Sequence, residues 1–149
     1  MTQWQDYLKL LRGLSKTLQE LAQVEREKNA AASTGNLRGV EECMKREQVL
    51  SLSLRGCDQK RDKLLAQLGL TGVGLRDLER HSPEEHRLET KAVAEELRQQ
   101  YEIFQTASKL ARHTLEANLR AIERTQAVQA GDRAEAEELR RAHQTDFKA

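Results

Sequence analysis

The stretch YLKLLRGLSKTLQELAQV, Tyr7–Val24, determines the fold class of this chain. Its apolar residues recur at alternating steps of four and three positions: Tyr7, Leu11, Leu14, Leu18 and Leu21. This mean period of about 3.5 residues places the five side chains along one face of a helix, as in the seam of a coiled coil. With Trp4 and Leu8 beside that face, the pattern predicts a helix over about residues 2–31.

The composition of the whole chain favours the same class of structure. Of its 149 residues, 33% are charged and only 3% are aromatic. Leu, Ala, Glu, Lys, Arg and Gln are the dominant types, which is typical of long helices and coiled coils. One proline and few β-branched Val or Ile residues argue against a sizeable sheet. We therefore expect an all-α protein.

Turn residues separate the first helix from a second one. The segment STGN, residues 33–36, contains Gly35, which can adopt the positive φ of a helix end, and Asn36, which can cap the next helix. An apolar pattern interrupted by Glu47 then predicts a helix over about residues 37–68, which Gly69 ends.

The segment SPEE predicts the start of a third long helix. It places Ser82 at the N-cap, Pro83 at the first helical position and Glu85 at the position of a capping-box carboxylate. The periodic pattern continues over about residues 83–128, which corresponds to a helix nearly 70 Å long.

The predicted domain organisation is one helical bundle over residues 1–129. We expect a long antiparallel helical hairpin or a three-helix bundle, with an extended third helix and coiled-coil-like packing. The remaining segment, residues 130–149, is polar and is expected to be a C-terminal tail, either disordered or containing a short helix that starts after Gly131.

The glycine-rich stretch LGLTGVGLRDL, residues 68–78, raises the question of a phosphate-binding loop. Its spacing matches neither G-x-G-x-x-G nor G-x-x-x-x-G-K-[ST], it follows an amphipathic helix rather than a strand, and no lysine lies nearby. Glycine is also the usual residue of helix ends and turns. We therefore interpret the stretch as a helix-to-helix connection.

The sequence offers no clear catalytic or metal-binding pattern. The four histidines form no H-E-x-x-H or Glu-x-x-His pair, and Cys43 and Cys57 lack C-x-x-C spacing. Glu47 is a candidate inward carboxylate for a helical metal site, but such a residue more often pairs with a neighbour. A Ser, Cys or His triad depends on geometry, so spacing alone leaves it open. We expect no catalytic residue, no metal site and no cofactor.

The charge pattern argues against nucleic acid or a membrane as the main partner. The formal net charge is only +1, and no apolar run approaches the ~20 residues needed to span a bilayer. Lys109, Arg112, Arg120 and Arg124 could form a basic stripe, but Glu116 and Glu123 are interleaved with them. The simpler interpretation is a solvated helix face with ion pairs.

The two cysteines fit a reducing compartment. They lie two heptads apart on one predicted helix, about 21 Å from each other, which is too far for an intrachain disulfide. We therefore expect a cytoplasmic protein.

The third predicted helix carries apolar residues without an evident partner. If the second and third helices are antiparallel, the second accompanies the third only to about Leu115. Leu119, Ile122 and Val128 lie beyond that point. Either they pack on the first helix or belong to a frayed end, or they form a surface that recruits another helix.

The segment VEREKNAAASTGNLRGVEECMKREQVLSLSLRGCDQKRDKLLAQLGL, Val24–Leu70, resembles the FlgN-like flagellar export chaperones. The features in common are a glutamate late in the first helix, a small turn, and a Leu-spaced helix with a lysine near its start and an arginine near an LL..LG ending. The corresponding residues are Glu25, Lys45, Arg61, Leu64, Leu65, Leu68 and Gly69. The later GLRDL is similar to the family's link to its third helix, whereas QQYEIFQ, Gln99–Gln105, lacks the family's early asparagine pair.

The resemblance implies a non-enzymatic, cytoplasmic chaperone of flagellar type III export. It would bind the C-terminal helical segment of secreted hook–filament junction proteins, prevent their early assembly and deliver them to the export gate. In that family the C-terminal part of the chaperone binds the client. The apolar residues of that part are Leu110, Leu115, Leu119, Ile122 and Val128.

The expected partners are therefore hook–filament junction proteins and components of the export gate. We expect no nucleic acid, no membrane insertion, and a monomer or weak dimer. The alternative function is a helical coiled-coil adaptor or spacer without a flagellar role, and a nucleic-acid-associated helical protein is a third reading.

Overall fold

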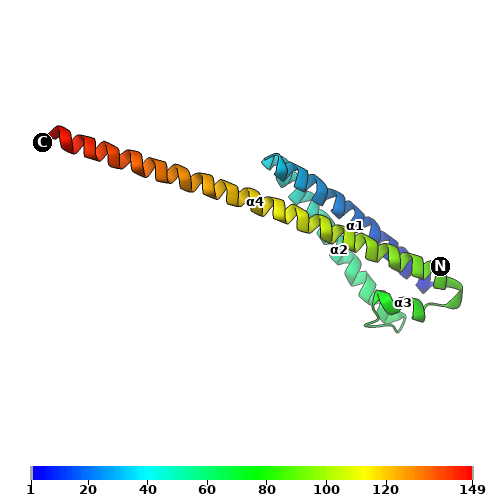
Figure 1. Ribbon diagram of the computed structural model, residues 1–149. Coiled ribbons are helices and arrows are strands. Elements are labelled where there is room, and N and C mark those ends of the chain that lie inside the picture. The colour runs from blue at the N-terminus through cyan, green and yellow to red at the C-terminus, as the bar shows by residue number, and fades with distance from the viewer. Residues whose placement is uncertain (1, 149) are drawn as a thin grey trace.

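The structure is a computed structural model that describes residues 2–148, with side chains described for residues 2–141. The described residues form helices and no strand, as predicted (Figure 1). In chain order the elements are α1 (Gln3–Ser33), α2 (Leu37–Gln67), α3 (Leu75–His81), the 3₁₀ helix η1 (Glu84–His86) and α4 (Arg87–Lys148).

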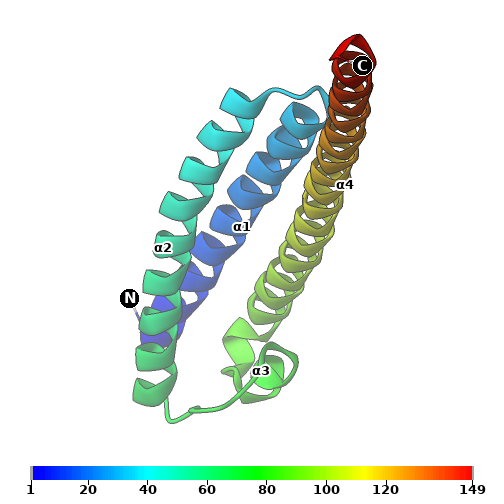
Figure 2. The same ribbon diagram turned by 90° about the vertical axis from the view of Figure 1, so that its left-hand side faces the viewer.

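Helix α1 lies between the other two long helices (Figure 2). It packs parallel to α4, since Trp4 bonds to Thr90 and Asn29 to Thr114. It packs antiparallel to α2, since Glu27 pairs with Arg46 near the start of α2 while Trp4 lies at Leu65 near its end. In the part of the chain that the structure describes, α2 and α4 share no pair of Cα atoms within 8 Å. The arrangement follows from the sequence of α1, which buries twelve of its residues, whereas α2 buries three.

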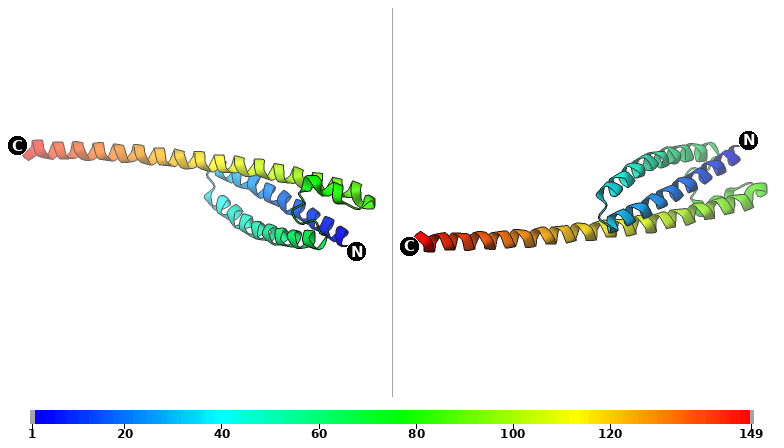
Figure 3. Two further views of the ribbon diagram at one scale, coloured as in Figure 1. Left: turned by 90° about the horizontal axis from the view of Figure 1, so that it is seen from below. Right: turned by 90° about the horizontal axis from the view of Figure 1, so that it is seen from above.

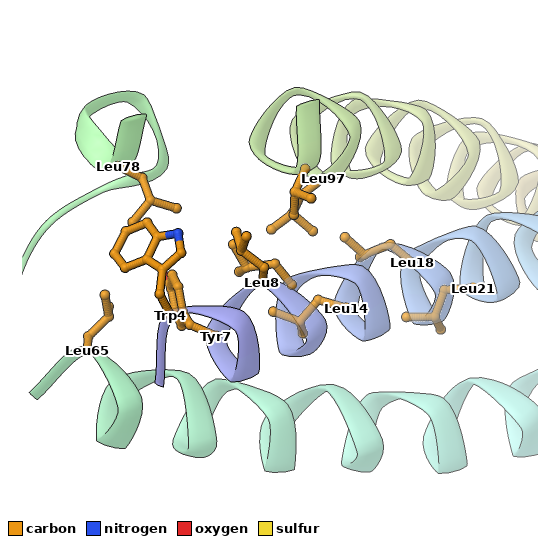
Figure 4. Packing of buried hydrophobic residues seen from close by; sticks show 11 residues of the cluster. Trp4, Tyr7, Leu8, Leu14, Leu18, Leu21, Leu65, Leu78 and Leu97 are labelled. Atoms are coloured by element: carbon orange, nitrogen blue, oxygen red, sulfur yellow. The ribbon is translucent and has the colours of Figure 1, made fainter. Parts of the chain in front are cut away.

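Buried residues of several helices meet at the N-terminal end of α1 (Figure 4). Trp4 packs among Leu65 of α2, Leu78 of α3 and its neighbour Tyr7, and all four side chains are buried. The Trp4 Nε1–H donates to the Thr90 hydroxyl at 3.0 Å, so the one polar group of the indole is satisfied inside the core. This cluster joins all four α-helices at one end of the bundle.

The predicted roles of Gly35, Asn36 and Gly69 at the ends of the first two helices are confirmed. Gly35 and Gly69 both have φ of 71°, a left-handed conformation that side-chain-bearing residues rarely adopt. Asn36 caps α2, because its side-chain oxygen accepts a hydrogen bond from the Gly39 N–H at 3.0 Å. The glycine-rich stretch is a connection between α2 and α3, as interpreted from the sequence.

The segment between α2 and α4 differs from the prediction. Residues Leu75–His81 form the separate helix α3, which Leu78 anchors in the core with no exposed surface. The predicted capping box at Ser82 is wrong: the Ser82 hydroxyl donates to the Glu79 carbonyl at 2.7 Å, and α4 begins only at Arg87. Ser82 is thus used to end α3 rather than to start α4.

The C-terminal segment also differs from the prediction. Helix α4 passes through Gly131 without a break and continues to Lys148, instead of ending near residue 128 before a polar tail (Figure 1). Residues 130–148 consist mainly of Ala, Glu and Arg, whose high helix propensities outweigh the ~1 kcal/mol cost of one glycine. The expected unit boundary at residue 129 stays a prediction.

Candidate functional site

Helix α4 extends well beyond the end of α1 (Figure 3). The five residues predicted to bind a client all lie on α4, near and beyond that point. Four of them are at least half exposed: Leu110 (55%), Leu119 (57%), Ile122 (50%) and Val128 (63%). Leu115 is partly buried. Large apolar side chains this exposed on one helix are a candidate binding surface if they share a face.

The five residues do not share one face. At 3.6 residues per turn, Leu115, Leu119 and Ile122 lie on one side of α4, because they are separated by four and three positions. Leu110 and Val128 are each nine positions from Leu119, which is two and a half turns and therefore the opposite side. We call Leu115, Leu119 and Ile122 the seam face.

The seam face continues the interface between α4 and α1. Leu97, Phe104 and Ala111 follow each other at steps of seven and pack toward α1. Leu115 lies four positions after Ala111 and Ile122 a further seven, so both lie on the adjacent row of the same coiled-coil face. Helix α1 ends at Ser33, beside Asn118, whose side-chain amide donates to the Ala32 carbonyl. Ile122 is therefore exposed because its row continues beyond the end of α1, whereas Leu119 lies at the edge of this face, seven positions after the exposed Arg112. The boundary predicted from the length of the second helix is set instead by the end of α1.

A groove between α2 and α4 lies closer to α3 than the seam face does, beside the N-terminal part of α4. It has a volume of about 340 Å³, and it exists because both helices pack on α1 but not on each other. Apolar residues of all four α-helices line it: Leu14, Leu18, Leu54, Leu75, Leu97 and Tyr101. Sequence reasoning missed this groove, although the position of Tyr101, one helical turn after Leu97, was a usable signal.

Glu47, the interruption in the apolar pattern of α2, belongs to an ion cluster with α1. The Lys28 Nζ lies 3.2 Å from Glu25 Oε2 and also forms an ion pair with Glu47, and all three side chains are largely buried. Burial, followed by the nearby charge of Glu47, raises the pKa of Glu25, although Lys28 opposes this shift. Burial also lowers the pKa of Lys28, but the hydrogen bond from Lys28 to Glu47 and the two carboxylate charges outweigh this and raise it overall.

The cluster gives no sign of a metal site. Among the described residues, no group of three or more His, Cys, Asp or Glu side chains is placed to hold a metal ion. Glu25 and Glu47 are instead held by a lysine, which makes the cluster a link between α1 and α2.

The predicted ion pairs along α4 are not observed. Within residues 2–141, Lys109, Arg112 and Arg124 form no ion pair, and the Arg120 Nε–H donates to the Glu116 backbone carbonyl at 3.4 Å rather than to its carboxylate. These side chains are exposed. The prediction of a solvated helix face is therefore confirmed, whereas the prediction of ion pairs on that face is not.

None of the described helices combines the length and the apolar character needed to cross a bilayer.

In comparisons with known proteins, a family model described as FlgN protein matches residues 1–143 of the chain. No curated protein and no solved structure matches it. The match covers nearly the whole chain, including α4 and the seam face.

Proposed function

The chain belongs to the FlgN family of flagellar export chaperones, and from this premise we propose that its clients are hook–filament junction proteins, bound through their C-terminal helical segments. We further propose that it acts in the cytoplasm as a monomer or weak dimer and delivers its clients to the export gate. The family is one of chaperones rather than of enzymes, which agrees with a role in binding alone.

The observation that carries this proposal is the seam face. Ile122 continues the apolar row of Leu115 past the end of α1, and Leu119 lies beside this row, so a client helix can pack on α4 there. When the client helix packs on α4, its own apolar face is covered. The client can then no longer pair with other client molecules through that face. Delivery to the export gate requires release, which fits an affinity in the micromolar range.

The size of the seam face limits what it contributes to that affinity. Full burial of a Leu or Ile is worth ~1.5–3 kcal/mol, and Leu119 and Ile122 are already about half buried. Covering these two side chains therefore yields roughly 1.5–3 kcal/mol, whereas micromolar binding needs about 8 kcal/mol. The client helix must therefore contact a larger surface than the seam face.

Calorimetric titration with a peptide of the C-terminal helix of a hook–filament junction protein tests the proposal. We expect micromolar binding by the unmodified chain and none by the double variant Leu119→Asp, Ile122→Asp. The matched control is Leu110→Asp, Val128→Asp, which introduces the same two charges on the opposite side of α4 and should bind normally.

Two results would contradict the proposal. Normal binding by the Leu119/Ile122 variant, with its helix content retained by circular dichroism, would exclude the seam face. Absence of binding by the unmodified chain to the C-terminal peptide of every hook–filament junction protein would exclude these clients.

A further inference from the structure

The groove between α2 and α4 is an apolar surface that the bundle leaves uncovered. Leu14 and Leu18 of α1 form its floor, while Leu54 of α2 and Tyr101 of α4 line its two sides. A volume of about 340 Å³ is at the small end of the ~300–1,000 Å³ range of ligand pockets. The groove can therefore accept a few side chains of a helix that lies across its rim, but not the helix itself.

Two arginines at the groove carry unpaired positive charge. Arg61 of α2 is half-buried and Arg98 of α4 is exposed, and both line the groove together with a single acidic residue, Asp58. Neither arginine forms an ion pair or a side-chain hydrogen bond within the described part of the chain. By contrast, Arg12 and Arg46, which lie at the other helix interfaces, are paired with Glu89 and Glu27.

The unpaired state of Arg61 matters because it is half-buried. A guanidinium group that has lost part of its hydration gains more from an arriving carboxylate than a fully solvated one does. Leu14 and Leu54, which line the groove with Arg61, are apolar and cannot balance its charge. Acidic side chains of a partner are therefore the group that complements Arg61.

The groove and the seam face lie on the same side of α4. Leu119 follows Tyr101 by eighteen residues, which is five full turns, so the two side chains project from the helix in the same direction about 27 Å apart. Leu115 follows Tyr101 by two heptads and lies on the same row. One helix of ~25 residues placed along α4 could therefore contact Leu97 at one end and Ile122 at the other.

We propose that the α2–α4 groove and the seam face together form one docking surface for a single amphipathic client helix, whose acidic residues pair with Arg61 and Arg98. This inference rests on the proposed chaperone function and specifies the chemistry of the client: an apolar stripe with carboxylates beside the part that enters the groove. The groove supplies the additional contact area that the seam face lacks for micromolar binding.

The test uses the full chain and the same C-terminal peptide of a hook–filament junction protein, titrated at low salt. The double variant Arg61→Glu, Arg98→Glu should bind about tenfold more weakly, or worse, because the rim then repels the carboxylates of the client. The matched control Arg38→Glu, Arg55→Glu makes the same change in net charge at two exposed arginines of α2 that do not line the groove, and it should bind within about twofold of the unmodified chain.

A milder variant guards against misfolding. Arg61→Gln, Arg98→Gln removes the charges without reversing them and should weaken binding by a smaller factor. The peptide with all Asp and Glu replaced by Asn and Gln should lose affinity for the unmodified chain but not for the Arg61/Arg98 variants.

The outcomes separate the two proposals. If Arg61→Glu, Arg98→Glu binds as the unmodified chain does while Leu119→Asp, Ile122→Asp does not bind, the groove is overturned and the chaperone function stands. If the groove variant and the control lose affinity equally, the effect is one of net charge, which also overturns the groove. Absence of binding by the unmodified chain overturns both proposals.

Discussion

Replacement of Lys28 by Met tests whether the ion cluster holds α1 and α2 together. The Lys28 Nζ lies 3.2 Å from Glu25 Oε2, and at an effective dielectric constant of ~20 this attraction amounts to roughly 5 kcal/mol before desolvation is subtracted. Lys28→Met leaves two buried carboxylates without a cation, and loss of one partner from a buried ion pair costs ~3–5 kcal/mol. We expect the free energy of unfolding to fall by about 3 kcal/mol at pH 7.

Equilibrium unfolding in urea, followed by circular dichroism, measures this loss. The control is Lys16→Met, which removes an exposed lysine of the same helix that forms no ion pair in the described part of the chain, and should change the stability by less than about 0.5 kcal/mol.

The pH dependence of the variant gives an independent check. In the native chain the pKa of Glu25 is raised. At pH values between its unfolded-state and folded-state pKa, folding is therefore accompanied by uptake of a proton. The contribution of Glu25 to the free energy of unfolding consequently increases as the pH falls through that range. Without Lys28 the pKa of Glu25 rises further, so the deficit of Lys28→Met should shrink from pH 7 to pH 5. A deficit below about 0.5 kcal/mol at pH 7, or one that grows toward pH 5, would refute the reasoning.

Three further substitutions probe the fold, each by urea unfolding. Leu78→Ala should cost ~2–5 kcal/mol, because this side chain of α3 is fully buried in the core, and a cost below about 1 kcal/mol would mean that α3 is not anchored there. Gly69→Ala should cost about 1 kcal/mol through backbone strain alone, since φ is 71° and no atom lies within 4 Å of the added Cβ; no loss would argue against the left-handed turn. Trp4→Phe should cost about 1–3 kcal/mol by removing the hydrogen bond to Thr90 and leaving that buried hydroxyl without its donor, and Thr90→Val should restore part of this.

Local sequence signals sufficed for the first two helices and their ends. The four–three spacing from Tyr7 to Leu21 determines which face of α1 is buried, and the positive φ of Gly35 and Gly69 ends α1 and α2 where glycine is required. The family resemblance read from residues 24–70 is likewise confirmed by the family match.

The remaining elements depend on tertiary contacts that local signals do not report. Helix α3 has only seven residues and is held by the burial of Leu78, and Ser82 was misassigned because its hydroxyl serves the preceding helix. The continuation of α4 past Gly131 reflects the summed propensity of its neighbours, which a single glycine does not override.

The candidate site was only partly predictable for the same reason. Periodicity identified Leu119 and Ile122 as apolar residues without a partner, and the predicted helix over about residues 83–128 already implies that the five predicted residues lie on opposite sides of it. The sequence did not show that α1 is the partner helix and ends beside Asn118. The α2–α4 groove exists because α1 lies between α2 and α4. This arrangement depends on how the three helices pack together, so it cannot be predicted from any single segment of the sequence.

Site-specific photocrosslinking tests the central claim most directly. A photoreactive amino acid is placed at position 119 or at position 128, which lie on opposite sides of α4, and each protein is mixed with a full-length hook–filament junction protein. Client docking on the seam face predicts a crosslink to the C-terminal helix of the client from position 119 and little or none from position 128. A crosslink from position 128 alone, or equal crosslinking from both positions, would contradict it.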